Sequence, residues 1–161
     1  IVQTEEKTMH DLNFTSAIIA LDQVSDPGNL GTIIRTADWF AVPQLLLSEG
    51  CVDVWNEKVV RSTMGSLFHV TVVQSERLVH DITFLKKERG YRVLGFTLNG
   101  KPMPESIKGS KVIFLFGSES HGLRPELESL LDTRYTIAGS GKAESLNVAV
   151  SAGIALSRFH V

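Results

Sequence analysis

A glycine-rich loop that opens a helix is the stretch of this sequence best suited to bind a small ligand. A short strand is predicted from Tyr135 to Ala138, the loop Gly139-Ser140-Gly141-Lys142-Ala143-Glu144 follows, and a helix is predicted to start near Ser145-Leu146-Asn147. Ser and Asn oxygens cap helix starts, because they accept from backbone N–H groups that lack a helical partner. Such a loop offers free donors, a favourable dipole and close approach. The pattern predicts a ligand site, although plain caps and turns share this composition.

Two nucleotide-binding motifs do not fit this loop. A P-loop requires a glycine five residues before Gly141, and Thr136 occupies that position. A dinucleotide-binding fingerprint requires a third glycine after Gly139 and Gly141, where Glu144 stands. Neither motif therefore identifies the ligand.

A second polar loop precedes a helix near the start of the chain. Ser25-Asp26-Pro27-Gly28-Asn29 is dense in turn-forming residues, and an amphipathic helix is predicted from Leu30 to about Ala41. Arg35 lies about one turn from this loop. Its guanidinium could pair with Asp38, three residues on, or reach a ligand held at the loop.

Apolar segments of strand length alternate with helical patterns along the chain. The strands are predicted at 16–24, 44–47, 70–73, 91–97, 111–116 and 135–138, and the helices at 30–41, 56–68, 75–89, from 125 and from about 148. Strands that are apolar on both faces predict an α/β domain with a parallel sheet covered by helices on both sides. Ligands of such sheets bind beyond the carboxyl ends of the strands. The polar loops 25–31, 117–122 and 139–147 are expected at that edge.

The whole chain bounds the class of protein. Its 161 residues, 43% of them hydrophobic, suit one domain with a real core. Residues 1–13 are predicted to be a polar tail or linker. Cys51 is the single cysteine, which favours a reducing, cytoplasmic setting and excludes an internal disulfide or a cysteine-based metal site. His69, His80 and His121 lack metal-ligand spacing. The net charge of −2 is not typical of a free-standing nucleic-acid binder.

The last predicted helix, 148–156, is apolar almost all round. Such a helix is normally buried. At the end of a chain it must dock on the sheet and on a partner chain as well. The sequence therefore predicts a homodimer.

Three motifs in order resemble the SpoU family of RNA 2′-O-ribose methyltransferases, in the SPOUT superfamily. They are Asn29 to Arg35 within Asp26-Pro27-Gly28-Asn29-Leu30-Gly31-Thr32-Ile33-Ile34-Arg35, then Gly117-Ser118-Glu119-Ser120-His121-Gly122, then Ser145-Leu146-Asn147-Val148. The segment Val60-Arg61-Ser62-Thr63-Met64-Gly65-Ser66 also looks like the family. The likeness covers about residues 16–159, and residues 14–161 are expected to form the catalytic domain. Ala138 and Gly139 depart from the family, which often has Pro and an apolar residue there.

The resemblance implies a fold, a cofactor and site residues. The fold would be an α/β domain with a C-terminal trefoil knot, and the active site would form at a dimer interface. S-adenosylmethionine would be the methyl donor and transfer or ribosomal RNA the substrate. The cofactor would contact Thr97, Leu98, Gly117, Ile137, Gly139 and Leu146, and the polar active-site positions would be Asn29, Arg35, Glu119, Ser145 and Asn147.

Arg35 is the residue that the family would make central. Because an arginine ordinarily stays protonated, we expect it to clamp the target phosphate or the developing alkoxide rather than to act as a free base. Asn29 would hold Arg35 or the ribose, Glu119 would orient loops or face the sulfonium, and the third motif would fix the nucleotide and the methionyl end. Two alternatives remain: a non-enzymatic RNA- or nucleotide-binding module on this scaffold, and a base-nitrogen methyltransferase of the same fold.

Overall fold

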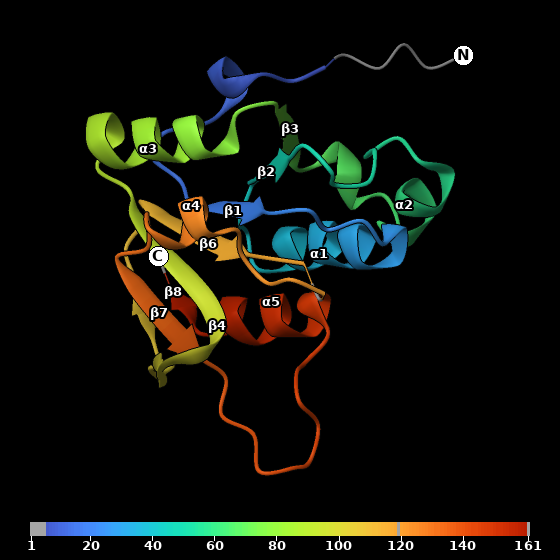
Figure 1. Ribbon diagram of the computed structural model, residues 1–161. Helices are drawn as coiled ribbons and strands as arrows, with labels where there is room; N and C mark the ends of the chain where they lie inside the picture. The colour runs from blue at the N-terminus through green and yellow to red at the C-terminus, as the bar shows by residue number, and fades with distance from the viewer. Residues whose placement is uncertain (1–5, 119, 161) are drawn as a thin grey trace.

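A sheet of six parallel strands lies at the centre of the computed structural model, which describes residues 6–118 and 120–160. The strand order is β3-β2-β1-β6-β4-β7 (Figure 1). The strands are β1 (Ile18–Leu21), β2 (Gln44–Ser48), β3 (Thr71–Ser75), β4 (Arg92–Pro102), β6 (Val112–Phe116) and β7 (Thr133–Thr136). The predicted parallel sheet is confirmed. A separate pair, β5 (Ile107–Lys108) and β8 (Phe159–His160), was not predicted, because two-residue strands are too short to show periodicity.

Side chains of the central strands alternate between two hydrophobic cores. In β1, Ile19 and Leu21 face one core, whereas Ile18 and Ala20 face the other. All four are fully buried. A strand buried on both faces must be apolar at every position, which is why the sequence shows continuous apolar runs rather than alternation.

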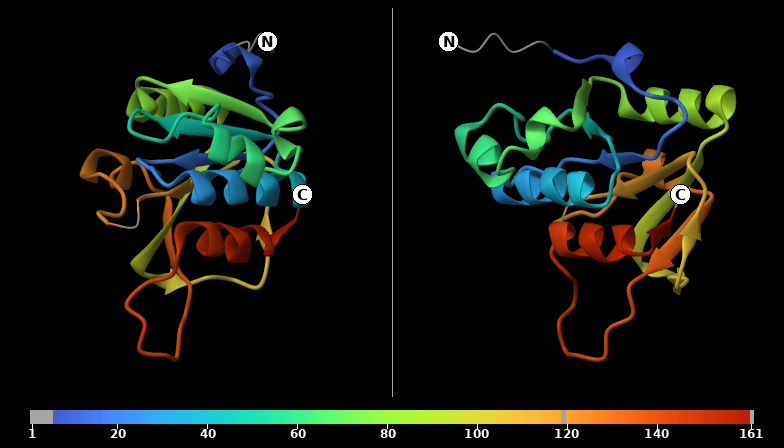
Figure 2. Two further views of the ribbon diagram at one scale, coloured as in Figure 1. Left: turned by 90° about the vertical axis from the view of Figure 1, so that its right-hand side faces the viewer. Right: turned by 180° about the vertical axis from the view of Figure 1, so that it is seen from behind.

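Helices cover both faces of this sheet (Figures 1 and 2). One core contains residues of α1 (Pro27–Trp39), α2 (Glu57–Ser62) and α5 (Val148–Leu156). The other contains residues of α3 (Leu78–Arg89) and α4 (Pro125–Glu128). α1 and α5 pack side by side, so the first and last α-helices of the described chain are neighbours. None of the described helices is long and apolar enough to cross a membrane.

The helix predicted over 56–68 is interrupted. α2 ends at Ser62, and the backbone of Met64 and Gly65 is left-handed, with φ of 51° and 95°. A 3-10 helix, η2 (Ser66–Phe68), follows. A left-handed glycine commonly ends a helix because it lacks a Cβ, and the apolar spacing on either side of it concealed this break.

β4 extends beyond its predicted end at Thr97. Its register with β7 shifts between Phe96 and Lys101, and pairing resumes between Lys101 and Tyr135. Near the start of the chain, η1 (Met9–Asp11) precedes a buried Leu12 that packs on the α3 side. The trefoil knot implied by the resemblance stays a prediction.

Candidate active site

The polar loops that follow β1 and β6 leave the sheet at its switch point. β1 and β6 are neighbours, with Leu21 opposite Phe116. The chain leaves β1 for α1 on one face of the sheet and leaves β6 for α4 on the other. Loops that diverge in this way open a crevice beyond the strand ends, where parallel α/β sheets bind ligands.

The amino ends of α1 and α5 meet through two asparagines. Asn147 caps α5, since its Oδ1 accepts from the backbone nitrogens of Ala149 at 2.9 Å and Val150 at 3.3 Å. Its Nδ2 donates to Oδ1 of Asn29 at 2.9 Å. One side chain therefore both starts a helix and connects the first predicted motif to the third. Asn147 therefore has the predicted capping role, and the loops of the first and third motifs lie close together, as predicted.

The capping residue of α1 also shapes this contact. Asp26 accepts from the backbone nitrogen of Asn29 at 2.8 Å, and Pro27 follows at the first helical position. This combination is favourable at a helix start, because the carboxylate binds a free N–H and proline needs none. Asn29 is thereby held in the first turn of α1, with its side chain directed to Asn147.

Arg35 is exposed on α1, and its possible pairing with Asp38 is not formed. Asp38 instead lies 3.0 Å from Nδ1 of His69. The hydrogen bond from His69, followed by one from Ser66, lowers the pKa of Asp38 below its ordinary value. Within the described part of the chain, no ion pair or hydrogen bond engages the Arg35 side chain. Its guanidinium is therefore available to a ligand.

The other predicted polar residues are not part of this hydrogen-bonded pair. Ser145 is exposed and lies two positions before Asn147, the cap of α5. Arg35 lies six positions after Asn29 on α1. Glu119 lies outside the described residues. A hydrogen bond thus joins Asn29 and Asn147, two of the described catalytic candidates.

Four of the predicted cofactor residues lie on or directly after neighbouring strands. Thr97 and Leu98 lie on the far part of β4, Gly117 directly follows β6, and Ile137 directly follows β7. These strands are adjacent in the order β6-β4-β7. Thr136 Oγ1 donates to the carbonyl oxygen of Leu98 at 3.2 Å, which joins two of the segments. A hollow of about 580 Å³ lined by 98–101 and 132–134 includes only Leu98 of the predicted set.

Two features of these segments fit a polar organic cofactor. The hydroxyl of Thr97 is buried and has no hydrogen-bond partner among the described residues, and such groups normally find one. In the third loop, a Cβ built on Gly139 or Gly141 would meet nothing within 4 Å. The predicted cofactor segments therefore contain a hydroxyl without a partner among the described residues, at Thr97, and open space beside Gly139 and Gly141. Residues of this set have no metal-binding character, and the described residues contain no group of three or more His, Cys, Asp and Glu able to hold a metal ion.

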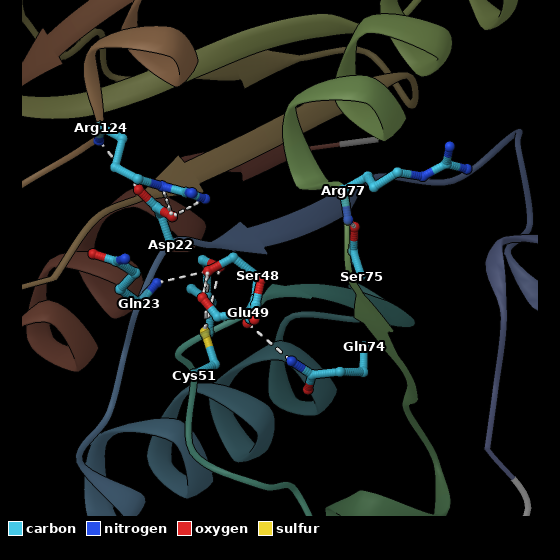
Figure 3. A network of polar contacts seen from close by, with 10 residues as sticks. Asp22, Gln23, Ser48, Glu49, Cys51, Gln74, Ser75, Arg77 and Arg124 are labelled. Atoms are coloured by element: carbon cyan, nitrogen blue, oxygen red, sulfur yellow. Dashed lines mark hydrogen bonds and ion pairs between the residues drawn. The ribbon is translucent and has the colours of Figure 1, made fainter.

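Two charged residues at the switch point were not singled out from the sequence. Asp22 follows β1 and is 1% exposed, and Arg124 binds it with Nη2 2.7 Å from Oδ1 (Figure 3). The available signal was a carboxylate directly after a fully apolar strand, because a buried charge requires a partner. The partner could not be identified, since 102 residues separate the two.

The fold is shared with methyltransferases of known structure. The profile of the SpoU rRNA Methylase family matches residues 16–157. The chain belongs to this family.

Three relatives illustrate the likeness. The 23S rRNA (guanosine(2553)-2′-O)-methyltransferase RlmP of Bacillus subtilis is 40% identical over 138 residues, covering 85% of this chain and 55% of the relative. An AdoMet-bound rRNA methyltransferase from Sinorhizobium meliloti superposes with a TM-score of 0.86 at 33% identity, covering 96% of this chain and 60% of that one. The SpoU methyltransferase AviRb of Streptomyces viridochromogenes, solved with the cofactor AdoMet, gives 0.85 at 27% identity, covering 97% and 64%. The chain thus spans somewhat more than half the length of these proteins.

Proposed function

We propose that this protein transfers a methyl group from S-adenosylmethionine to a ribose 2′-hydroxyl of ribosomal or transfer RNA. The observation that carries the proposal is the hydrogen bond between Asn29 and Asn147, which joins two motif loops of a SpoU-family chain. The exposed Arg35 lies on the same helix as Asn29. The relatives named as rRNA methyltransferases, and the AdoMet in two neighbouring structures, support the substrate class and the cofactor.

The cofactor would be held by segments that lie on adjacent strands or follow them. Thr97, Leu98, Gly117, Ile137, Gly139 and Leu146 would contact it, largely through backbone groups. When bound, S-adenosylmethionine supplies an electrophilic methyl group on a sulfonium. The buried Thr97 hydroxyl and the space around Gly139 support this assignment.

The polar side chains would align the RNA substrate and stabilise the negative charge that develops on it. Arg35 would clamp the target phosphate or the alkoxide that develops as the hydroxyl loses its proton, because a guanidinium binds oxyanions through a rigid fork of donors. Asn29, fixed by Asn147, would orient the ribose or Arg35. Ser145 and Asn147 would position the nucleotide and the methionyl end, and Glu119 would orient the second motif loop or face the sulfonium.

We further propose that two copies associate through the exposed side of the α1–α5 pair. Trp39 is 84% exposed and Val150 49%, and both flank the contact where Thr36 approaches Gly153. Trp39 lies three residues after Thr36 on α1, and Val150 lies three residues before Gly153 on α5. Because the two helices run in the same direction, these opposite offsets place both side chains on the same side of the helix pair. Large exposed apolar side chains gathered on one face mark an interaction site. A partner there would cover Arg35's helix and exclude water from the site. The predicted cytoplasmic setting stays a prediction.

A direct test combines cofactor binding with product analysis. The purified chain is titrated calorimetrically with S-adenosylmethionine and then incubated with ribosomal or transfer RNA and methyl-labelled cofactor. Nucleoside digestion of the RNA should yield 2′-O-methylated nucleosides. Label in a base instead would establish the base-nitrogen alternative, and absence of cofactor binding by a folded dimer would leave the non-enzymatic binding module.

A further inference from the structure

The loop that carries the second motif is fastened at both of its ends by one residue. Asp22 donates its backbone N–H to the carbonyl oxygen of Phe116 at 2.8 Å, just before Gly117. Its carboxylate accepts from the backbone nitrogen of Arg124 at 3.1 Å, just after Leu123. The loop 117–123 therefore begins and ends on a single buried residue at the end of β1.

The Arg124 side chain strengthens the exit of this loop. Its Nε donates to Asp22 Oδ1 at 2.9 Å, and Nη2 lies 2.7 Å from the same oxygen (Figure 3). The Arg124 side chain is 39% exposed, whereas Asp22 is 1% exposed. A buried carboxylate is stable only when charged or polar groups satisfy it, and the guanidinium is the main side-chain partner of Asp22.

Two backbone hydrogen bonds join Ser118 to Gly122. Ser118 N donates to Gly122 O at 3.2 Å, and Gly122 N donates to Ser118 O at 2.9 Å. A Cβ on Gly117 would lie 2.1 Å from the Gly122 carbonyl carbon. The two ends of the loop are thus in van der Waals contact, and a shift at the exit would be transmitted to Gly117.

The residue that follows Asp22 is also held in place. Gln23, the next residue, has a left-handed φ of 57°, and its backbone nitrogen donates to Ser48 Oγ at 2.9 Å. Figure 3 shows this bond beside the Asp22–Arg124 pair. The chain from β1 toward Asn29 is therefore anchored at Gln23, directly after the residue that holds the second motif loop.

We infer that Asp22 and Arg124 are positioning residues that hold the Gly117 loop in the shape that accepts the cofactor. The inference rests on the proposed function, because it assigns the cofactor to Gly117. Neither residue touches the reacting atoms. They act through the backbone of Ser118, Gly122 and Gly117, so their removal should weaken cofactor binding more than the chemical step.

The experiment compares Arg124→Gln with Lys86→Gln. Lys86 makes an ion pair of similar length, with Asp132 at 2.8 Å, and also binds Leu130 O at 2.7 Å, but it lies at the opposite end of the strands. Because Arg124→Gln leaves a buried carboxylate, the charge-free double variant Asp22→Asn/Arg124→Gln is measured as well. The first readout is amide hydrogen exchange of Ser118 and Gly122 in the free protein. The second is the affinity and KM for S-adenosylmethionine against kcat.

Arg124→Gln and the double variant should speed exchange at Ser118 and Gly122 by about 10-fold or more and raise KM for the cofactor similarly, with kcat within about 3-fold. Lys86→Gln should change neither readout, and Arg124→Lys should recover part of the loss. Unchanged exchange in both Arg124→Gln and the double variant, or faster exchange with unaltered cofactor affinity, overturns the inference. If the wild-type chain binds no cofactor, the proposed function fails, and the exchange comparison alone decides whether the pair holds the loop.

Discussion

The Asn147 side-chain amide donates a hydrogen bond to the Asn29 side-chain oxygen at 2.9 Å, across 118 positions of sequence. The same amide caps α5 through its oxygen. Because the two atoms of one amide have different partners, capping and motif contact can be separated by substitution.

Asn147→Asp should keep the cap and lose the donor to Asn29, whereas Asn147→Ala loses both. We expect Asn147→Ala to lower the free energy of unfolding by about 1 kcal/mol, since a helix cap is removed. Asn147→Asp should leave stability close to wild type. Both should reduce methyl transfer, measured at saturating RNA. Full activity in Asn147→Asp would show that the Asn29 contact is dispensable.

Arg35→Ala should separate function from stability. The side chain is exposed and unpaired among the described residues, so its loss should change the free energy of unfolding by less than about 0.5 kcal/mol. Turnover should fall on the order of 10²–10³, as for the loss of one aligned donor. Arg35→Lys should recover little, because an ammonium lacks the bidentate fork. Near-normal turnover of Arg35→Ala at saturating RNA would rule out the clamp.

Substitution by alanine should have different effects at two glycines of the expected cofactor loops. A Cβ on Gly117 would lie 2.1 Å from backbone of Gly122, whereas one on Gly141 would meet nothing within 4 Å. Gly117→Ala should cost about 1–3 kcal/mol of stability and weaken cofactor binding, because backbone must move. Gly141→Ala should stay within about 0.5 kcal/mol of wild type. Thermal unfolding and calorimetric titration of both variants check this, and equal behaviour would contradict it.

Charges introduced beside the α1–α5 contact should prevent association. Trp39→Lys combined with Val150→Lys places two like charges on the proposed interface. Sedimentation equilibrium should give a dimer for the wild type and a monomer for this variant, with loss of methyl transfer. Met64→Lys is the matched control, since Met64 is 74% exposed on the turn after α2. A monomeric wild type that is fully active would refute the proposed dimer.

Tyr91 should make stability depend on alkaline pH. Burial raises the pKa of Tyr91 to about 12, and its hydroxyl donates to Ser16 O at 2.7 Å. An unfolded tyrosine has a pKa of about 10, so the folded state favours the neutral form. The resulting stabilisation is complete below about pH 10 and is lost as pH rises toward about 12. The stability advantage of wild type over Tyr91→Phe, about 1 kcal/mol at pH 7, should shrink over that range in urea unfolding. A constant difference would contradict the raised pKa.

Local sequence determined the elements and the faces that they bury. Continuous apolar runs identified β1 and β6 as strands buried on both faces, and helical spacing identified α1 and α3, because these signals depend only on neighbouring residues. The motif residues Asn29 and Asn147 were also recognisable in the sequence, and their order along the chain indicated the family. Element ends were less predictable: the left-handed turn at Gly65 and the continuation of β4 past Thr97 depend on neighbours in space.

Only the tertiary structure decided which polar groups meet. Asp38 pairs with His69 rather than with Arg35, although Arg35 is nearer in sequence, because η2 packs against α1. Asp22 finds Arg124 because β1 and β6 are neighbours in the sheet, and Asn29 finds Asn147 because α5 packs beside α1. Hydrogen bonds and ion pairs act over a few ångströms, so their partners are set by the packing of the layers and not by separation along the chain.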